Sequence, residues 1–203
     1  MIIYPQKLGL KFTRTALYDT ITEAHICKTI EGEFGRRYLR GSSVINEHKV
    51  SDQEYKIICA EHKFRDQIKD RDINNVVEIG TNLGVGSLLL AHYAYHLTTI
   101  DIFPRTEPLP LWDYFGMSPK ITYAVAQNDE SKKDFISTLD FDFACIDGDH
   151  TYDGVKLDFE AVKKCGRVLI CGYDIHKGVT KFVNELPKNE TEKTFRFVYW
   201  EKR

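Results

Sequence analysis

The chain has 203 residues, of which 42% are hydrophobic and 12% aromatic, and this composition excludes an intrinsically disordered protein. Its length suffices for one domain with a hydrophobic core. With 28 basic and 30 acidic residues the net charge is −2, so charge offers no reason to expect a nucleic-acid partner.

The cysteines and the apolar runs indicate the cellular compartment in which the protein is expected. Five cysteines, an odd number without a CxxC pair, argue against a disulfide framework or a zinc site and favour the cytoplasm. The N-terminus lacks the basic and apolar regions of a signal peptide, and no segment approaches ~18 consecutive apolar residues. We therefore expect neither a secreted nor a membrane protein.

Residues 1–74 form the first part of the chain, which we predict to be an irregular, partly helical N-terminal extension. Helices are expected at residues 18–30 and 52–70. Ser51 is the expected N-cap of the second, and Glu54 lies three residues later, at capping-box spacing. The glycines of residues 31–43 predict a loop. We expect this extension to shape an acceptor site or a homodimer contact.

Residues 75–203 show the alternation of a second, α/β part. Short apolar runs at 76–79, 97–103, 121–126, 141–146 and 168–171 alternate with amphipathic stretches at 86–95, 129–138 and 152–164. This rhythm predicts βαβ units in a doubly wound, mostly parallel sheet. Near the C-terminus we expect a helix at 178–186 and one strand at 194–200, at the sheet edge.

A glycine-rich turn follows the first of these strands, and glycines there are expected to let a ligand approach the backbone closely. Its glycines at positions 80, 84 and 86 fit neither the G-x-G-x-x-G dinucleotide fingerprint nor a P-loop. Glu78, before the turn, favours a cationic ligand over a phosphate. Asp101 ends the next strand about 20 residues later, where an acid can accept hydrogen bonds from a ribose diol. The alternative is a ligand-free turn with a helix-capping Asp101.

Ionisable side chains follow two later strands. Asp147, Asp149 and His150 come after one, and Asp174 and His176 after the next. Because neighbouring parallel strands end at the same edge, Asp147 and Asp174 are expected to face one pocket, as acid–base or metal chemistry requires. Thr151 and Asp153 are expected to cap the following helix.

Residues 104–120 connect the second and third strands and contain four prolines with Trp112, Tyr114 and Phe115. A structureless connection of this length is unusual unless it covers a site. One interpretation is a lid over the ligand. The other is a surface loop whose aromatic side chains tuck into the sheet edge.

Residues 78–84, Asp101 and the segment FACIDGDHTYDGV at 143–155 resemble class I S-adenosylmethionine-dependent methyltransferases, in particular the macrocin O-methyltransferase and cephalosporin hydroxylase group. The resemblance spans residues 76–175 and implies a Rossmann-like methyltransferase fold. It implies that the cofactor is S-adenosylmethionine, with its ribose on the acid after the second strand and its adenine flanked by residues 127–129. The cofactor-binding residues would be Glu78, Gly80, Thr81, Asn82, Gly84, Ser87, Asp101, Asn128 and Asp147.

Two mechanisms follow from this resemblance, with Asp147, His150 and Asp174 as the catalytic candidates. A divalent ion such as Mg²⁺ could hold an acceptor hydroxyl pair between carboxylates, as in catechol O-methyltransferase. Tyr173 and Ile175 supply no second ligand beside Asp174. In the other mechanism His150 is the general base on a hydroxyl.

The leading function is therefore methyl transfer to a small molecule or sugar, with a hydroxyl oxygen as the expected target. Two alternatives stay open at this stage. One is a hydroxylase-like enzyme on the same fold, which would use iron. The other is a non-catalytic scaffold, which an intact glycine turn and Asp101 disfavour.

Overall fold

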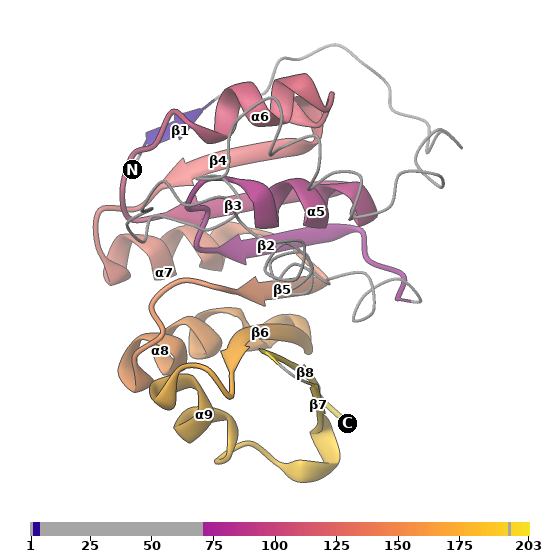
Figure 1. Ribbon diagram of the computed structural model, residues 1–203, viewed down its shortest axis with the longest axis vertical. Helices are drawn as coiled ribbons and strands as arrows, with labels where there is room; N and C mark the ends of the chain where they lie inside the picture. The colour runs from indigo at the N-terminus through magenta and orange to yellow at the C-terminus, as the bar shows by residue number, and fades with distance from the viewer. Residues whose placement is uncertain (1, 5–70, 195) are drawn as a thin grey trace, which may run out of the picture.

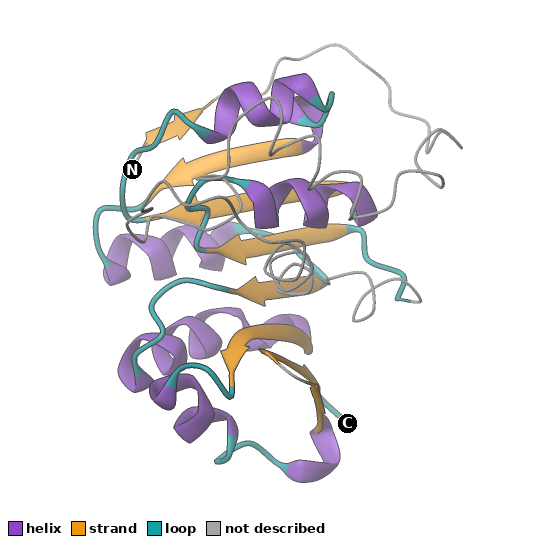
Figure 2. Ribbon diagram, viewed as in Figure 1, coloured by secondary structure: helices purple, strands orange, loops and turns teal. Residues whose placement is uncertain are grey.

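The computed structural model describes residues 2–4, 71–194 and 196–203, and Figure 1 traces them from the N-terminus to the C-terminus. The expected helices at 18–30 and 52–70 and the expected loop at 31–43 lie outside these residues. The described residues form one mixed sheet between two layers of helices (Figure 2).

The sheet contains eight strands in the order β1-β4-β3-β2-β5-β6-β8-β7. Its five central strands, from β4 to β6, are parallel, and β1 and β8 run antiparallel to their neighbours. The doubly wound, mostly parallel sheet predicted from the sequence is confirmed. In chain order the strands are β1 Ile2–Tyr4, β2 Asn75–Ile79, β3 His96–Asp101, β4 Ile121–Val125, β5 Phe143–Ile146, β6 Arg167–Tyr173, β7 Thr191–Thr194 and β8 Arg196–Glu201.

Helices cover both faces of this sheet. The helices are α5 Val85–Tyr93, α6 Pro108–Tyr114, α7 Asp129–Thr138, α8 Tyr152–Val162 and α9 Lys177–Val183, with short 3₁₀ turns at Ser118–Lys120, Lys163–Cys165 and Lys188–Glu190. Side chains of α5 and α6 pack in the core on one face, and those of α7, α8 and α9 pack on the other. Figure 1 shows the two layers on opposite sides of the strands.

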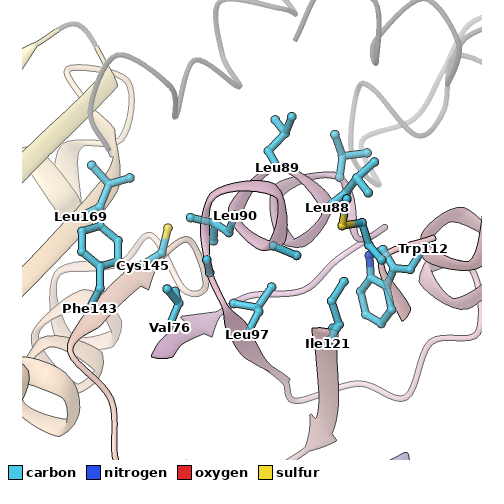
Figure 3. Packing of buried hydrophobic residues seen from close by; sticks show 14 of the residues in the cluster. Val76, Leu88, Leu89, Leu90, Leu97, Trp112, Ile121, Phe143, Cys145 and Leu169 are labelled. Carbon is cyan, nitrogen blue, oxygen red and sulfur yellow. The ribbon is translucent and has the colours of Figure 1, made fainter. Parts of the chain in front are cut away.

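The strands are apolar on both faces, as parallel strands between helix layers must be. In β2, Val76 packs on the α5 side and Val77 on the α7 side, because successive side chains of a strand point to opposite faces. Figure 3 shows Leu90 of α5 near Val76 and Leu88 near Trp112 in the core on the α5 side. None of the helices in this part of the chain is both long and apolar enough to cross a bilayer.

Two helices begin with the caps that local chemistry favours. The Thr151 hydroxyl accepts a hydrogen bond from the Gly154 N–H, and Asp153 lies in the first turn of α8, so both capping predictions are confirmed. The Asn128 side chain accepts from the Ser131 N–H and caps α7. These caps fix where each helix starts relative to the strand before it.

The prediction of a single C-terminal strand at the sheet edge is wrong. Two strands, β7 and β8, form an antiparallel pair, and β8 lies inside the sheet between β6 and β7. The four central residues of β8 are buried, so this strand needs neighbours on both sides. β7 reads Thr-Glu-Lys-Thr and is largely exposed, and a strand without apolar residues gives no hydrophobic signal.

Two further elements were not anticipated. Residues 2–4 form β1, which pairs with β4 and adds a strand to the sheet. The connection at 104–120 is not structureless, because it contains helix α6. This helix starts with Pro108 at its first position, where a proline is tolerated. Its Trp112 is 2% exposed and packs edge-on against Tyr123, so burial of this side chain holds the helix on the core.

Candidate active site

The glycine turn joins β2 to α5 at the carboxyl end of the parallel strands. Gly80 has a φ of +101°, and a Cβ on it would lie 2.2 Å from the carbonyl oxygen of Asp147. Its N–H donates to the Ile100 carbonyl at 2.8 Å. Position 80 therefore needs glycine because the tips of β2, β3 and β5 meet there without room for a side chain.

Gly84 is required by a different neighbour. Its φ is +82°, and a Cβ would lie 2.8 Å from the Trp112 indole nitrogen. The indole N–H donates to the Gly84 carbonyl at 2.8 Å. Helix α6 is thereby held against the glycine turn, and the close approach that we expected to serve a ligand is made here by the protein itself.

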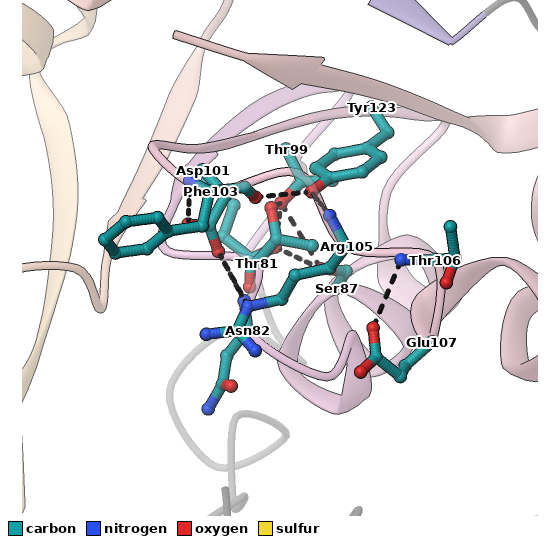
Figure 4. A network of polar contacts seen from close by, with 11 residues as sticks. Thr81, Asn82, Ser87, Thr99, Asp101, Phe103, Arg105, Thr106, Glu107 and Tyr123 are labelled. Atoms are coloured by element: carbon teal, nitrogen blue, oxygen red, sulfur yellow. Dashed lines mark hydrogen bonds and ion pairs between the residues drawn. The ribbon is translucent and has the colours of Figure 1, made fainter. Parts of the chain in front are cut away.

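Beneath the turn lies a buried polar network. The hydroxyls of Ser87 and Thr99 both donate to Oε2 of Glu78, the latter at 2.6 Å, and Thr81 shares a 2.7 Å hydrogen bond with Thr99. All four side chains are buried, and Figure 4 shows Thr81, Ser87 and Thr99 meeting under the turn. Glu78, Thr81 and Ser87 are thus brought together as an internal support of the turn.

Burial also changes the acidity of this network. Removal of the Glu78 carboxyl from water raises its pKa to about 8, and the hydrogen bonds from Ser87 and Thr99 only partly oppose that effect. The negative charges of Asp147 and Asp101 raise the pKa further. Glu78 is therefore neutral at pH 7 in the folded protein and ionised in the unfolded chain.

This shift predicts a pH dependence of stability. Between about pH 4.5 and pH 8 the folded state binds one proton more than the unfolded state at Glu78, so the free energy of unfolding falls as pH rises. The Glu78→Gln substitution removes the titrating carboxyl, so the variant does not lose this stability as pH rises. From pH 5 to pH 8 we expect the variant to gain on the order of 4 kcal/mol relative to the parent, measured by urea unfolding.

The matched control is Glu160→Gln, which removes an exposed carboxyl on α8 that forms an ion pair with Lys163. We expect its stability relative to the parent to be the same at both pH values. If Glu78→Gln and the parent show parallel pH dependence, Glu78 does not carry a raised pKa.

Asp101 ends β3 beside the glycine turn. One carboxyl oxygen accepts from the Asn82 N–H at 2.8 Å and the other from the Phe103 N–H at 3.0 Å (Figure 4). Arg105 Nε lies 4.0 Å from the oxygen that accepts from Asn82, which is too far for a hydrogen bond, so each carboxylate oxygen can still accept a second hydrogen bond. The Asp101 side chain is 10% exposed. The two sequence motifs therefore meet at this carboxylate, which retains acceptor capacity for a diol.

The residues after β4 lie at the neighbouring tip. Asn128 is exposed, and its side chain is engaged in capping α7. Below it, the Lys132 ammonium lies 2.9 Å from Asp129 and 2.5 Å from Asp158, a carboxylate with no exposed surface. A Cβ on Gly148 would lie 3.2 Å from Asp158, so this ion pair supports the loop after β5 from below.

The loop after β5 brings Asp147 and His150 together. His150 Nε2 lies 3.2 Å from Asp147 Oδ1, and both side chains are about one-third exposed. Asp149 instead accepts from the N–H and hydroxyl of Thr151 and closes a tight turn before α8. The contact between Asp147 and His150 was not predicted, and it places an acid beside the imidazole at this tip.

Asp174 follows β6, next to β5 in the sheet, as predicted. It is exposed with a φ of +62°, and its N–H donates to the Thr180 hydroxyl. It lines a shallow hollow with Lys177 and Lys181 and shares no hydrogen bond or ion pair with Asp147 or His150. Among the described residues, no group of three or more His, Cys, Asp or Glu side chains is arranged to hold a metal ion.

Three contacts of this region were not predicted from the sequence. Thr99 and Trp112 hold the glycine turn, and His176 stacks on His150 with ring centroids 4.1 Å apart. A polar residue two positions before Asp101 was the available signal for Thr99. His176 was expected after the strand next to β5, and that neighbouring position was the available signal for its stacking on His150.

A separate cavity of about 340 Å³ lies at the opposite ends of the strands. It is lined by the first residues of β2 and β3, Asn75 and His96, and by Thr122 of β4. Ligands of open α/β sheets bind beyond the carboxyl ends of the strands, so this cavity is on the wrong edge for the site described above.

Comparison with known proteins agrees with this geometry. Residues 77–167 match the sequence family described as a methyltransferase domain, a span that begins in β2 and ends at the start of β6. No curated protein matches the chain at a significant level. The sheet topology and the matched residues together define a Rossmann-like methyltransferase fold.

Solved structures share this fold. The O-methyltransferase of Bacillus cereus in complex with S-adenosylhomocysteine is 12% identical, with a TM-score of 0.56 over 92% of this chain and 94% of that chain. The O-methyltransferase TomG of Streptomyces achromogenes, bound to S-adenosylmethionine, is 17% identical, with 0.53 over 93% of each. The S-adenosylhomocysteine-bound methyltransferase PaMTH1 of Podospora anserina is 15% identical, with 0.53 over 90% and 89%. At these identities the likeness establishes the fold.

Proposed function

We propose that this chain is an S-adenosylmethionine-dependent methyltransferase that acts on a hydroxyl oxygen of a small molecule or sugar. The observation that carries the proposal is the Asp101 carboxylate, which accepts from the Asn82 N–H of the glycine turn and keeps acceptor capacity for a ribose diol. The methyltransferase-domain match and the cofactor-bound structures of the same fold support it.

The cofactor would lie along the carboxyl ends of β2 to β5. Asp101 would accept from the ribose hydroxyls, the turn at Asn82 would hold the amino-acid part, and Asn128 and Asp147 would border the two ends. The buried side chains of Glu78, Thr81 and Ser87 would act indirectly, because their hydrogen bonds maintain the conformation of the turn that would contact the cofactor. Gly80 and Gly84 would act by allowing β5 and α6 to pack against that turn.

The chemistry requires little more from the protein. The bound sulfonium is an activated methyl donor, so the chain must align the acceptor and remove its proton. His150 is the proposed general base, and Asp147 accepts a hydrogen bond from its Nε2–H, which leaves Nδ1 to take the proton. We favour this base over a metal-held hydroxyl pair because Asp174 does not join Asp147 and has no second donor beside it.

The subgroup is also part of the proposal. The segment at 143–155 resembles that of the macrocin O-methyltransferase group, and it contains both Asp147 and His150. A hydroxylase-like enzyme would need iron, and a scaffold would bind no methyl donor. If the folded protein binds no S-adenosylhomocysteine in the test below, these two alternatives remain, and bound iron separates them.

The test is isothermal titration of the purified protein with S-adenosylhomocysteine. Micromolar binding is expected, followed by a screen of hydroxylated acceptors with and without Mg²⁺ and location of the new methyl group by mass spectrometry and NMR. A folded protein that binds no S-adenosylhomocysteine would overturn the methyltransferase assignment.

His150→Gln tests the base. We expect methyl transfer to slow by about 10²–10⁴-fold, the usual contribution of general base catalysis, with cofactor affinity unchanged. His92→Gln on α5, far from the β5 loop in sequence and outside the proposed site, is the control and should retain the parent rate. Equal rates for His150→Gln and the parent would exclude His150 as the base.

A further inference from the structure

The described residues contain one pair of stacked imidazoles, His150 and His176. The ring centroids are 4.1 Å apart and the ring planes differ by 1°. The two residues belong to different loops, after β5 and after β6, so the stack joins the tips of neighbouring strands. Parallel rings at this distance cover one face of each imidazole.

The backbone around the stack has no spare room. Gly172 has a φ of +88°, and a Cβ on it would lie 2.8 Å from His176 Cδ2 and 3.1 Å from His150 Cδ2. The His176 N–H donates to the Gly172 carbonyl at 3.0 Å. On the other side, a Cβ on Gly178 would lie 2.5 Å from the His150 carbonyl oxygen. Two glycines thus let α9 and the end of β6 close on the His150 loop.

The charges around the pair differ for the two rings. Asp147 lies against Nε2 of His150 at 3.2 Å. The pKa of His176 is lowered, first by partial burial and then by the charge of His150, with Arg196 acting in the same direction and Asp147 opposing. A positive charge on His150 therefore disfavours a charge on His176.

We propose that His176 is a positioning residue for His150, an inference that rests on the proposed function. The stacked ring blocks rotation of the His150 imidazole, so Nε2 stays on Asp147 and Nδ1 stays available to the acceptor hydroxyl. When His150 takes the proton, its positive charge lies over a neutral aromatic ring rather than beside a second cation.

The test compares His176→Ala, which removes the ring, with His176→Phe, which keeps a flat ring without ionisable nitrogens. His176 is exposed, so neither change creates a cavity in the core. The first readout is the ¹⁵N-correlated Nε2–H signal of His150, which needs no acceptor. We expect an Asp147-bonded signal in the parent and in His176→Phe, and its loss in His176→Ala.

The second readout is kcat once an acceptor is found. We expect His176→Ala to lower kcat by between about tenfold and a hundredfold through misplacement of the base, with an unchanged Kd for S-adenosylhomocysteine. His176→Phe should restore kcat to within about twofold of the parent, since a stacked ring is the only property that the proposal requires.

The outcomes separate the two proposals. An unchanged Nε2–H signal in His176→Ala overturns the positioning role, whether or not the protein binds a methyl donor. If His176→Phe is as slow as His176→Ala, the imidazole nitrogens themselves are needed and the role is not positioning. Absence of S-adenosylhomocysteine binding to the parent overturns the proposed function but not the positioning role. The NMR comparison still reports whether His176 holds the His150 ring.

Discussion

Asp101→Ala is expected to raise the Kd for S-adenosylhomocysteine by about a hundredfold or more. Hydrogen bonds to a charged group contribute roughly 1.5–3 kcal/mol each, and two such bonds to a ribose diol correspond to at least that factor. The substitution also removes the acceptor of the Asn82 N–H, so the glycine turn loses a support at the same time. Isothermal titration of both proteins gives the ratio directly.

A matched control separates the site from general charge. Asp134→Ala removes an exposed carboxylate on α7, away from the tip of β3, and should leave the Kd unchanged. Equal Kd values for Asp101→Ala and the parent would show that the carboxylate only holds the turn. The ribose assignment would then be lost even if the protein binds the cofactor.

Gly80→Ala has the second large expected effect, on stability. At a φ of +101° the added Cβ would lie 2.2 Å from the Asp147 carbonyl oxygen and 2.8 Å from the Gly148 nitrogen. Backbone atoms cannot move aside as a flexible side chain does, so β2 and β5 must separate at their tips. Adding the cost of a left-handed alanine to that of an overfilled contact gives a loss of roughly 2–5 kcal/mol in the free energy of unfolding.

Gly86→Ala is the control within the same turn. Gly86 lies in α5 without a positive φ, so alanine should stabilise the helix by roughly 0.5–1 kcal/mol. Urea unfolding of the two variants and the parent measures both changes. A loss below 1 kcal/mol for Gly80→Ala would mean that the tips of β2 and β5 are not in close contact.

Part of the candidate site was readable in the sequence because it depends on strand order. Asp101 and Asp147 each follow an apolar run, and the carboxyl ends of parallel strands lie at one edge of a sheet. The contact of His150 with Asp147 was not predicted, but closeness along the chain favours it, since only two residues separate them. Such features need the fold class but no particular packing.

The remaining features of the site depend on contacts between distant segments. Trp112 reaches Gly84 across 28 positions, and the stack of His176 on His150 joins two loops that no local pattern connects. The glycine turn predicted a close approach by a ligand, whereas the close neighbours of Gly80 and Gly84 are β5 and α6. A glycine in the sequence indicates that there is no room for a side chain, but it does not identify the neighbouring atoms.

Apart from α6, the order of strands and helices from β2 to α9, and hence the fold class, was determined by the sequence alone, because hydrophobic periodicity and helix caps act over a few residues. Tertiary structure decided where each strand joins the sheet. β8 lies between β6 and β7, and β7 pairs through its backbone although its side chains are polar. Backbone pairing is nearly independent of side-chain identity, so only the assembled sheet could show these two positions.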